Sequence, residues 1–366
     1  MSDRTEAAPS PGTRLSEYDY ALPDDRIARY PAERRDESRL LVLPAADGAP
    51  FRHLRFRDVT ELLRPGDLLV VNESRVRPAR LLGRKPTGAP AEIFLLGPAD
   101  ESRHAQPDDP RDWIALVRPG SKLKPGRTVD IADDFVVEIL DSAPGNGRVV
   151  RLHTSGSVEA AIERHGHVPL PPYIDRDDEP LDRERYQTVY ARDPGSVAAP
   201  TAGLHFTDEL LARIEAMGVR RAAVSLHVGI GTFRPIDADD PEDHEMHHET
   251  YLVPESVADA VAETRAAGGR VWAVGTTVVR TLEAAARADG TLEPGPGSTD
   301  LFIRPPYDFR VVDALITNFH LPRSTLLMLV AALGGYERVM EAYRVAVDEG
   351  YRFYSYGDAM ALVRGG

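Results

Sequence analysis

Alternating apolar and polar residues recur in short runs between residues 79 and 152 of the chain. The runs are residues 79–82, 92–96, 113–117, 128–131, 135–140 and 148–152. Glycine and proline separate them, for example at residues 119–120, 125–126 and 145–147. Because a period of two residues is typical of a β-strand, the pattern predicts six short strands with no helix between them. Such a series favours a small β-barrel or sandwich.

A second pattern, in which helices alternate with strands, begins at about residue 156. Thr207 is expected to cap a helix that buries Leu210, Leu211 and Ile214 and ends at Gly218. Further strands are expected at residues 224–228, 270–274 and 310–317, and further helices from about residue 255, after residue 274, after Ser324 and over residues 336–349. One strand, residues 67–72, precedes the β-rich region. This alternation predicts an α/β domain.

Together the two patterns predict an α/β main domain with an inserted small all-β, barrel-like domain. The expected insert is residues 78–152, and residues 15–77 and 153–366 are expected to form one discontinuous α/β catalytic domain. The first 14 residues, rich in Ser, Thr, Pro and charge, are expected to be a disordered tail.

Composition narrows the classes of protein. The chain has 366 residues, of which 42% are hydrophobic and 28% charged, as in a globular protein. It has no cysteine, which excludes disulfides, thiolate metal sites and a cysteine nucleophile. The longest apolar run, residues 326–333, is far shorter than the ~20 residues of a membrane span, and no signal peptide is recognisable. A cytoplasmic protein without a membrane anchor is expected.

The net charge of −14 argues against binding to nucleic acid through overall attraction. A local basic cluster nevertheless stands out, formed by Arg75, Arg77, Arg80, Arg84 and Lys85 with no acidic residue among them. From charge alone, a nucleic-acid patch and an ordinary solvated face are equally good interpretations.

Polar residues interrupt four apolar runs at places where a core would exclude them. The runs are residues 197–206, 226–233, 274–277 and 311–322. Since an unpaired buried polar group costs about 1–3 kcal/mol, polar residues at these positions predict a functional site. Ligands of α/β proteins collect at strand ends, where these runs finish. The pattern therefore favours an enzyme.

Within these runs, three histidines and one aspartate are the candidates for proton transfer. His205 lies just before the helix expected to start at Thr207, His227 precedes a glycine-rich turn, and His320 ends the last run. Asp313 lies inside the apolar residues 311–316, where a carboxylate needs a partner. A structural His205, a plain turn after His227 and a hydrogen-bonded structural Asp313 are the alternatives.

Three familiar catalytic motifs are absent or unsupported. Residues 244–248 spell H-E-x-x-H, but no apolar stripe places both histidines on a stable helix, so no zinc site is expected. The glycine turn at Gly275 has no following Walker lysine, and no G-x-S-x-G sequence occurs. No metal is expected.

Several long segments in a constant order carry a resemblance to one family. They are residues 18–23 (Tyr-Asp-Tyr-Ala-Leu-Pro), 66–72 with Arg75 and 78–80, 167–174, 186–190, 242–244, 356–360 and the four runs above. Over residues 15–362 the chain resembles the S-adenosylmethionine:tRNA ribosyltransferase-isomerases of queuosine biosynthesis. The family architecture is an α/β domain with an inserted β-barrel.

The resemblance implies a specific reaction. The ribosyl unit of S-adenosylmethionine would pass to 7-aminomethyl-7-deazaguanine at the wobble position of a tRNA anticodon. It would rearrange to an epoxycyclopentane, giving epoxyqueuosine-tRNA and releasing adenine and methionine. S-adenosylmethionine would be a co-substrate, and no prosthetic group, metal or redox cofactor is implied.

Residue chemistry suggests roles at the matching positions. His205 is the leading candidate acid or base, with His227 and His320 as rivals and Asp313 as an orienting group. Thr276, Thr277, Arg280 and Asn318 would hold the methionine carboxylate and ribose. An aromatic ring, Phe206, Phe233 or Tyr173, would face the sulfonium. The remaining positions expected to contact the donor are Thr201, Gly203, Gly229, Gly231, Thr232 and Gly275.

The acceptor leaves alternatives open. The Arg75–Lys85 cluster is the expected tRNA-binding patch, since arginine and unpaired bases of an anticodon loop suit each other. A small-molecule acceptor with the same donor chemistry is a second interpretation, favoured by the acidic net charge. A non-catalytic RNA-binding protein is a third, and the expected burial of Asp313 argues against it.

Overall fold

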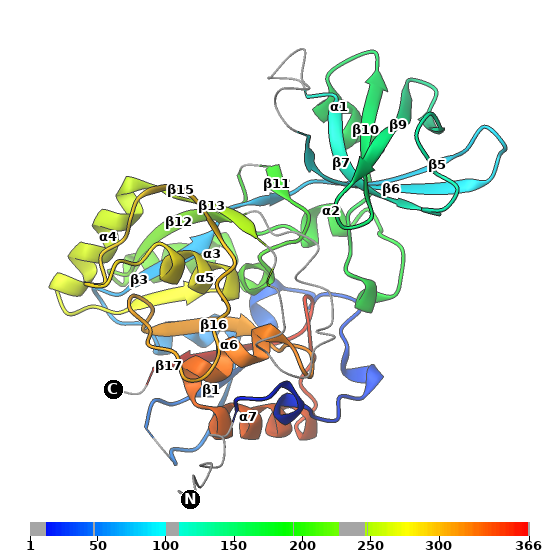
Figure 1. The fold of residues 1–366 in the computed structure, drawn as a ribbon. Helices are drawn as coiled ribbons and strands as arrows, with labels where there is room; N and C mark the ends of the chain where they lie inside the picture. Colours follow the sequence, from blue (N-terminus) through cyan, green and yellow to red (C-terminus); the bar gives the residue numbers. More distant parts are fainter. Residues whose placement is uncertain are drawn as a thin grey trace, which may run out of the picture.

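The computed structural model describes residues 12–46, 48–99, 110–192, 194–226, 246 and 248–364. It contains an α/β body and a β-barrel that projects from one end of the body (Figure 1). The expected tail, residues 1–14, lies outside the described residues except for its last three.

A mixed sheet of nine strands forms the centre of the body. In spatial order the strands are β15 (Gly295–Thr299), β13 (Glu249–Val253), β12 (Arg220–Leu226), β3 (Leu68–Asn72), β14 (Val271–Val274), β16 (Ala314–Asn318), β17 (Ala359–Val363), β1 (Arg39–Leu43) and β2 (Arg52–Arg55). The four central strands β12, β3, β14 and β16 are parallel. Their carboxyl ends therefore lie at one edge of the sheet.

Helices cover both faces of this sheet. One face packs on α4 (Glu255–Ala266), α5 (Thr276–Ala284), α6 (Thr325–Gly334) and α7 (Tyr336–Asp348). The other packs on α3 (Asp208–Ala216) and the 3-10 helix Phe56–Glu61. Successive residues of β3 alternate between the two cores, with Leu68 and Val70 on one side and Leu69 and Val71 on the other. Burial on both faces explains why this strand is a continuous apolar run.

The cap expected for α3 is confirmed. The Leu210 amide donates to Thr207 Oγ1 at 3.1 Å, and the chain leaves the helix through Gly218 with φ of 84°. Ser324 caps α6 in the same way, accepting from the Leu327 amide at 3.2 Å. In both helices the capping side chain satisfies an amide that has no partner within the helix.

The insert is a closed six-stranded barrel, which confirms the expected fold class. In spatial order its strands are β10 (Gly147–Thr154), β7 (Asp112–Arg118), β6 (Pro90–Pro98), β5 (Arg80–Arg84), β8 (Thr128–Ala132) and β9 (Phe135–Ala143). These are the six expected strands at similar or longer bounds. Helix α1 (Val158–His165), on the body side of the expected boundary, adds Val158, Ala161 and Ile162 to the barrel core.

Two short strands, β4 (Arg75–Val76) and β11 (Pro194–Ser196), pair beside the start of the barrel. The helix α2 (Asp182–Arg185) lies in the long segment between α1 and β11. No helix in the described part of the chain is both long enough and apolar enough to cross a membrane.

Some elements differ from the sequence expectation. Strands β1, β2 and β17, which complete one side of the sheet, were not predicted. β16 begins at Ala314 instead of residue 310.

Candidate active site

A small pocket lies at the carboxyl ends of β14 and β16, at the edge where the central parallel strands finish. Its volume is about 100 Å³. It is lined by Tyr173, residues 198–202, residues 275–277, residues 317–321, Ser324, Leu326, Tyr354 and Ser355. We call it the strand-end pocket. It contains Thr201, Gly275, Thr276, Thr277, Asn318 and His320 from the expected site.

Two helices begin at the strand-end pocket. Gly275, with φ of 90°, turns the chain from β14 into α5, and Ser324 is the N-cap of α6. The first amides of a helix have no intrahelical partner and carry partial positive charge, so both ends favour an anionic or strongly polar group. Thr277 Oγ1 is buried and has no hydrogen-bond partner among the described residues. It therefore offers an additional polar atom beside these amides.

Asn318, the last residue of β16, joins three parts of the chain. Its Nδ2 group donates to His205 Nε2 and to the Tyr354 carbonyl, each at 3.1 Å. These two bonds occupy both of its amide protons. Asn318 Oδ1 is buried without a hydrogen-bond partner in the part of the chain that the structure describes. An unpartnered buried carbonyl beside a pocket is the feature expected of a ligand contact.

His205 lies behind Asn318 and is not part of the pocket lining. It is 4% exposed, and its ring stacks on Phe56 at a centroid distance of 4.9 Å. Its Nδ1 is 2.7 Å from Ser38 Oγ, whose own proton is donated to the Arg35 carbonyl. The partners therefore assign the proton of the neutral ring to Nδ1 and the lone pair to Nε2.

The environment of His205 opposes a charge on the ring. Burial, and then the positive charges of Arg352 and Arg35, lower its pKa from 6.5 to about 3. His205 is consequently neutral near pH 7 and accepts from the amide of Asn318. His205, the leading candidate acid or base from the sequence, therefore lies outside the lining of the strand-end pocket.

His320 does line the pocket. Its Nε2 is 3.0 Å from Thr317 Oγ1, and burial lowers its pKa to about 3. Two tyrosine hydroxyls hold its backbone: the His320 amide donates to the Tyr343 hydroxyl at 3.0 Å, and the His320 carbonyl accepts from the Tyr20 hydroxyl at 2.5 Å. The ring is therefore neutral, fixed in place and at the pocket wall.

An aromatic pair forms another wall. The rings of Tyr173 and Tyr354 stack with centroids 4.3 Å apart and an interplanar angle of 22°. The Tyr173 hydroxyl is 2.7 Å from Ser355 Oγ, and burial raises the Tyr173 pKa well above 10. Tyr354 has φ of 70°, a costly conformation for a residue with a side chain, and its buried hydroxyl has no partner among the described residues.

Besides His205, four of the expected donor-contacting or catalytic residues lie outside the pocket lining. Asp313 precedes β16, at the opposite end of the strand from Asn318, and is not inside a buried strand as expected. Five residues of extended chain separate side chains by ~16 Å. The Asp313 carboxylate instead accepts from the Val271 amide at 2.8 Å. It joins the amino-terminal ends of two strands.

The other three residues, Arg280, Phe206 and Gly203, make contacts within the protein. Arg280 forms a buried ion pair with Glu249 and donates to the Leu301 carbonyl at 3.2 Å. Phe206 is fully buried and packs edge-on against Phe56, so it does not face a ligand. Gly203 lies under the Tyr190 hydroxyl, which would be 2.0 Å from an added Cβ atom. Its lack of a side chain serves close packing.

The run that follows β12 cannot be placed. His227, Gly229, Gly231, Thr232 and Phe233 lie outside the described residues, as do His244 and most of its H-E-x-x-H sequence. The described His248 is exposed and lies 3.8 Å from Asp300. Within the described ranges, no group of three His, Asp or Glu side chains is arranged to hold a metal ion.

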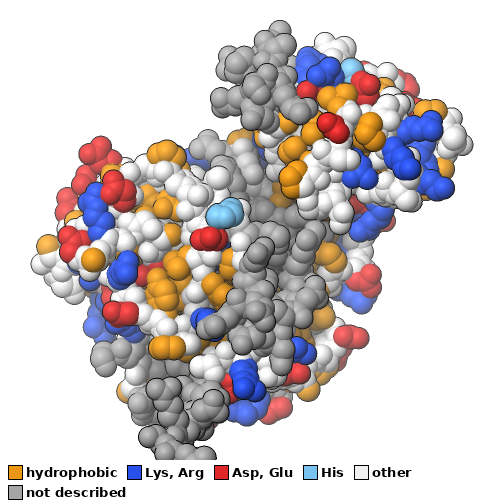
Figure 2. Space-filling model, in the orientation of Figure 1, with side chains coloured by type: hydrophobic (Ala, Val, Ile, Leu, Met, Phe, Trp, Pro, Cys, Tyr) orange, Lys and Arg blue, Asp and Glu red, His pale blue; other side chains and the backbone are white. Residues whose placement is uncertain are grey.

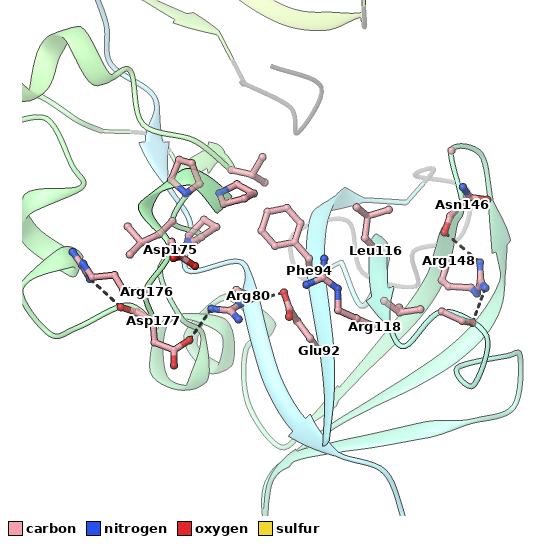
Figure 3. Close-up of a pocket in the computed structure, with 18 of the residues that line it drawn as sticks. Arg80, Glu92, Phe94, Leu116, Arg118, Asn146, Arg148, Asp175, Arg176 and Asp177 are labelled. Atoms are coloured by element: carbon pink, nitrogen blue, oxygen red, sulfur yellow. Dashed lines mark hydrogen bonds and ion pairs between the residues drawn. The ribbon is translucent and has the colours of Figure 1, made fainter. Parts of the chain in front are cut away.

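A second and much larger cavity lies between the barrel and the body (Figure 3). We call it the barrel cleft; its volume is about 1040 Å³. The barrel side includes Arg80, Glu92, Phe94, Arg118 and Arg148, and the body side includes residues 169–172, 175–177 and 197. Pro172 and Val197 line the cleft, whereas the adjacent Tyr173 and Ala198 line the strand-end pocket. The same two segments thus separate the two cavities.

The expected tRNA-binding patch is largely paired within the protein. Arg75 lies 3.4 Å from Glu163, Arg77 lies 3.3 Å from Glu159, and Arg80 lies 3.1 Å from Glu92. Arg84 donates to the Gly88 carbonyl at 2.9 Å, and Lys85 is half-buried. Of these five residues, the barrel cleft includes Arg80 alone.

Sequence reasoning missed Ser38, Tyr354 and Ser355. Ser38 precedes a strand that was not predicted, so no pattern pointed to it. Tyr354 and Ser355 adjoin residues 356–360, which the family resemblance did include. The signal available in the sequence was the pair Tyr354 and Ser355 within a segment rich in aromatic residues.

Comparisons with known proteins agree with this architecture. A family model described as "Queuosine biosynthesis protein" matches residues 15–362. The chain is 52% identical to the S-adenosylmethionine:tRNA ribosyltransferase-isomerase of Symbiobacterium thermophilum, over 96% of this chain and 100% of that protein. It is 53% identical to the protein of the same name from Anaeromyxobacter dehalogenans, over 96% of this chain and 99% of the relative.

A solved structure is also similar. The crystal structure of the S-adenosylmethionine tRNA ribosyltransferase from Thermotoga maritima has 41% sequence identity and a TM-score of 0.54. The match covers 95% of this chain and 100% of the Thermotoga chain.

Proposed function

The chain belongs to the queuosine biosynthesis protein family, and we propose that it transfers and isomerises the ribosyl group of S-adenosylmethionine on a tRNA base. The acceptor is the 7-aminomethyl-7-deazaguanine base at the wobble position of the anticodon. The products are epoxyqueuosine-tRNA, adenine and methionine. The protein acts in the cytoplasm, where its tRNA substrate is present.

The main support for an S-adenosylmethionine site is the set of unpartnered polar atoms at the strand-end pocket. Asn318 Oδ1, Thr277 Oγ1 and the Tyr354 hydroxyl are all buried without partners in the described part of the chain. They fit a polar co-substrate. A volume of about 100 Å³ holds part of such a molecule, and the amino-terminal end of α5 suits its carboxylate. The stacked Tyr173 and Tyr354 offer aromatic surface to a sulfonium.

His205 and His320 have different roles in this proposal. A sulfonium makes the adjacent ribose carbon acidic, and His320 is the proposed base, because it is the imidazole that lines the pocket and burial keeps it neutral near pH 7. His205 acts through Asn318: its Nε2 accepts one amide proton and thereby directs Asn318 Oδ1 away from itself. His205 is therefore a positioning residue.

The acceptor amine attacks in its neutral form and adenine leaves as the ring rearranges. Among the described residues that line the pocket, His320 is the one imidazole, and there is no carboxylate, lysine or arginine. The proton taken by His320 is thus the proposed source for the departing adenine.

The decisive experiment incubates the purified protein with S-adenosylmethionine and an anticodon stem-loop that carries the precursor base. Adenine release and the mass of the modified RNA are measured together. The proposal requires both, and a stem-loop with guanine at the same position is the negative control. Turnover of the free precursor base alone would support the small-molecule alternative, and RNA binding without adenine release would support a non-catalytic RNA-binding protein.

A further inference from the structure

We infer that the barrel cleft binds the single-stranded anticodon loop, with Arg118 contacting a phosphate and Phe94 providing a stacking face for an unpaired base. The inference rests on the proposed function and specifies where its RNA substrate lies. It moves the RNA contact from the expected Arg75–Lys85 cluster to the cleft face of the barrel. The arguments are charge, side-chain availability and the position of the cleft relative to the donor pocket.

Charge is distributed unevenly between the barrel and the rest of the chain. Residues 78–152 carry eleven Lys and Arg against eleven Asp and Glu, although the whole chain has a net charge of −14. The entire negative excess therefore lies outside the barrel. Within residues 118–127, Arg118, Lys122, Lys124 and Arg127 occur with no acidic residue. Figure 2 shows Lys and Arg side chains gathered on the barrel. An RNA backbone is therefore repelled less by the barrel than by the rest of the chain, and the basic residues of the 118–127 stretch attract it.

Arg118 has an available guanidinium in the cleft. It is exposed, and among the described residues no side-chain hydrogen bond or ion pair engages it. Figure 3 shows it beside Phe94 without a marked interaction. The other cleft arginines are occupied: Arg148 donates to the Leu123 carbonyl at 3.1 Å, and Arg176 pairs with Asp182 at 2.7 Å. A phosphate would thus meet Arg118 without first displacing an internal partner.

The carboxylates of the cleft have arginine partners other than Arg118. Glu92 and Asp177 share Arg80, at 3.1 and 3.6 Å, and Asp175 lies 3.7 Å from Arg29. Glu92 is also opposite Arg118 in the register of β6 and β7. No hydrogen bond or ion pair between these two side chains is found among the described residues, so the Arg118 guanidinium remains available to a phosphate.

Phe94 supplies the second element of single-strand recognition. The half-buried residue lies in β6 and lines the cleft together with residues 169–172, and Figure 3 shows its ring beside Arg118. Aromatic faces stack unpaired bases in single-stranded RNA sites, and neighbouring cations contact the backbone. The volume of about 1040 Å³ is at the upper end of the ~300–1,000 Å³ typical of small-molecule sites. A loop of nucleic acid suits this size.

The position of the cleft brings such a loop to the donor. Residues 172 and 173, and residues 197 and 198, face opposite cavities although they are neighbours in the chain. These two segments form the wall between the cavities. A base that leaves the RNA loop at this wall is therefore separated from the strand-end pocket by the wall alone. Taking the reacting base out of its stack is the general requirement for chemistry on a nucleobase.

The test measures RNA affinity of the full-length protein with a fluorescent anticodon stem-loop and no donor present. Arg118→Ala should weaken binding by about fivefold to tenfold and reduce the salt slope by about 0.7, since one phosphate contact is lost. Phe94→Leu keeps an apolar side chain and should weaken binding by about fivefold with an unchanged salt slope. Affinity for S-adenosylmethionine, measured by calorimetry, should stay within about twofold of wild type for both.

Arg344→Ala is the matched control. Arg344 is an exposed arginine on α7, at the end of the body away from the barrel (Figure 1). Its loss removes the same charge and should leave RNA affinity unchanged. Wild-type affinity and salt slope in Arg118→Ala, or equal weakening in Arg344→Ala, would overturn the cleft assignment while wild-type adenine release still supported the proposed function. A wild-type protein that neither binds the stem-loop nor releases adenine would overturn both.

Discussion

Asn318, His205 and His320 show how single residues divide the work at the strand-end pocket. One amide group joins His205 to the strained backbone of Tyr354 and leaves its carbonyl oxygen to the pocket. His320 lines the same pocket from a backbone held by two tyrosines. The residue that touches the ligand and the residue that positions it can therefore be tested separately.

Replacing His320 tests the proposed base. His320→Gln should lower kcat about 100-fold or more, because general-base catalysis contributes roughly 10²–10⁴ in rate. Affinity for S-adenosylmethionine should change little, since the ring is not assigned to hold the donor. Adenine release under saturating substrates measures the effect. His153→Gln, at an exposed histidine of the barrel, is the control; near wild-type kcat in His320→Gln would contradict the assignment.

The neutrality of both histidines predicts a loss of stability in acid. In the unfolded chain histidine binds a proton below about pH 6.5, whereas in the folded protein the pKa values of His205 and His320 are about 3. Acid therefore favours the unfolded state, and the free energy of unfolding should fall steadily as the pH drops below about 6.5. Urea denaturation at about pH 7, 6 and 5 measures this.

His205→Gln should flatten that dependence by up to ~1.4 kcal/mol per pH unit, because one titrating group is removed. The same substitution at the exposed His153 is the comparison. If wild type and His205→Gln lost stability in parallel between about pH 6.5 and 5, His205 would not be buried in neutral form.

Residue-level prediction from sequence succeeded for part of the site. Thr276, Thr277, Asn318 and His320 follow apolar strands, and strand ends of a parallel sheet converge, so their pattern predicted proximity. Asp313 and Arg280 are also polar residues of the predicted site, but they lie outside the pocket lining and have partners within the protein. Whether a buried charge meets a ligand or an internal partner depends on tertiary contacts, such as the Glu249 carboxylate beside Arg280, that spacing does not encode.

At the scale of elements, helices and strands with a strong period were predicted well. The six barrel strands, α3 with its Thr207 cap and α6 with its Ser324 cap are confirmed. Strands β1 and β17 were not predicted, although they pair in parallel beside β16. Their residues are apolar on both faces, and such short runs carry no period that distinguishes a strand from a helix segment.

Helices α3 and α6, each capped by a hydroxyl side chain, allow a matched test of whether a helix start contributes to the strand-end pocket. Ser324→Ala and Thr207→Ala should each reduce the free energy of unfolding by about 1 kcal/mol, because each leaves a terminal amide unpaired. Ser324 also lines the strand-end pocket and donates to the Leu321 carbonyl at 2.8 Å, whereas Thr207 lies outside the pocket lining.

Ser324→Ala should therefore also weaken S-adenosylmethionine binding several-fold, and Thr207→Ala should not. Urea denaturation and calorimetry on the same preparations separate the two effects. Equal donor affinity in both variants would show that the start of α6 does not contribute to the donor site.

At the scale of the whole molecule, function depends on how the barrel is held over the body, because the barrel cleft lies between them. Arg80 pairs with His167 across the junction through backbone hydrogen bonds at 3.3 and 2.8 Å. Gly166, next to His167, packs against the chain as it enters the barrel: an added Cβ would lie 1.9 Å from the Pro78 carbonyl oxygen. The atoms nearest to this added Cβ belong to the backbone and not to a flexible side chain, so the overlap could be relieved only by a backbone shift.

Gly166→Ala should consequently force the two chain segments apart. We expect a loss of about 2 kcal/mol or more in the free energy of unfolding, typical of overpacking at a rigid contact. RNA affinity should fall with it, because the same junction sets the width of the barrel cleft, while S-adenosylmethionine affinity should be kept. Gly156→Ala is the control, since an added Cβ there meets no atom within 4 Å. A Gly166→Ala protein with wild-type stability and RNA affinity would mean that the junction yields freely and that the barrel position is not fixed by this contact.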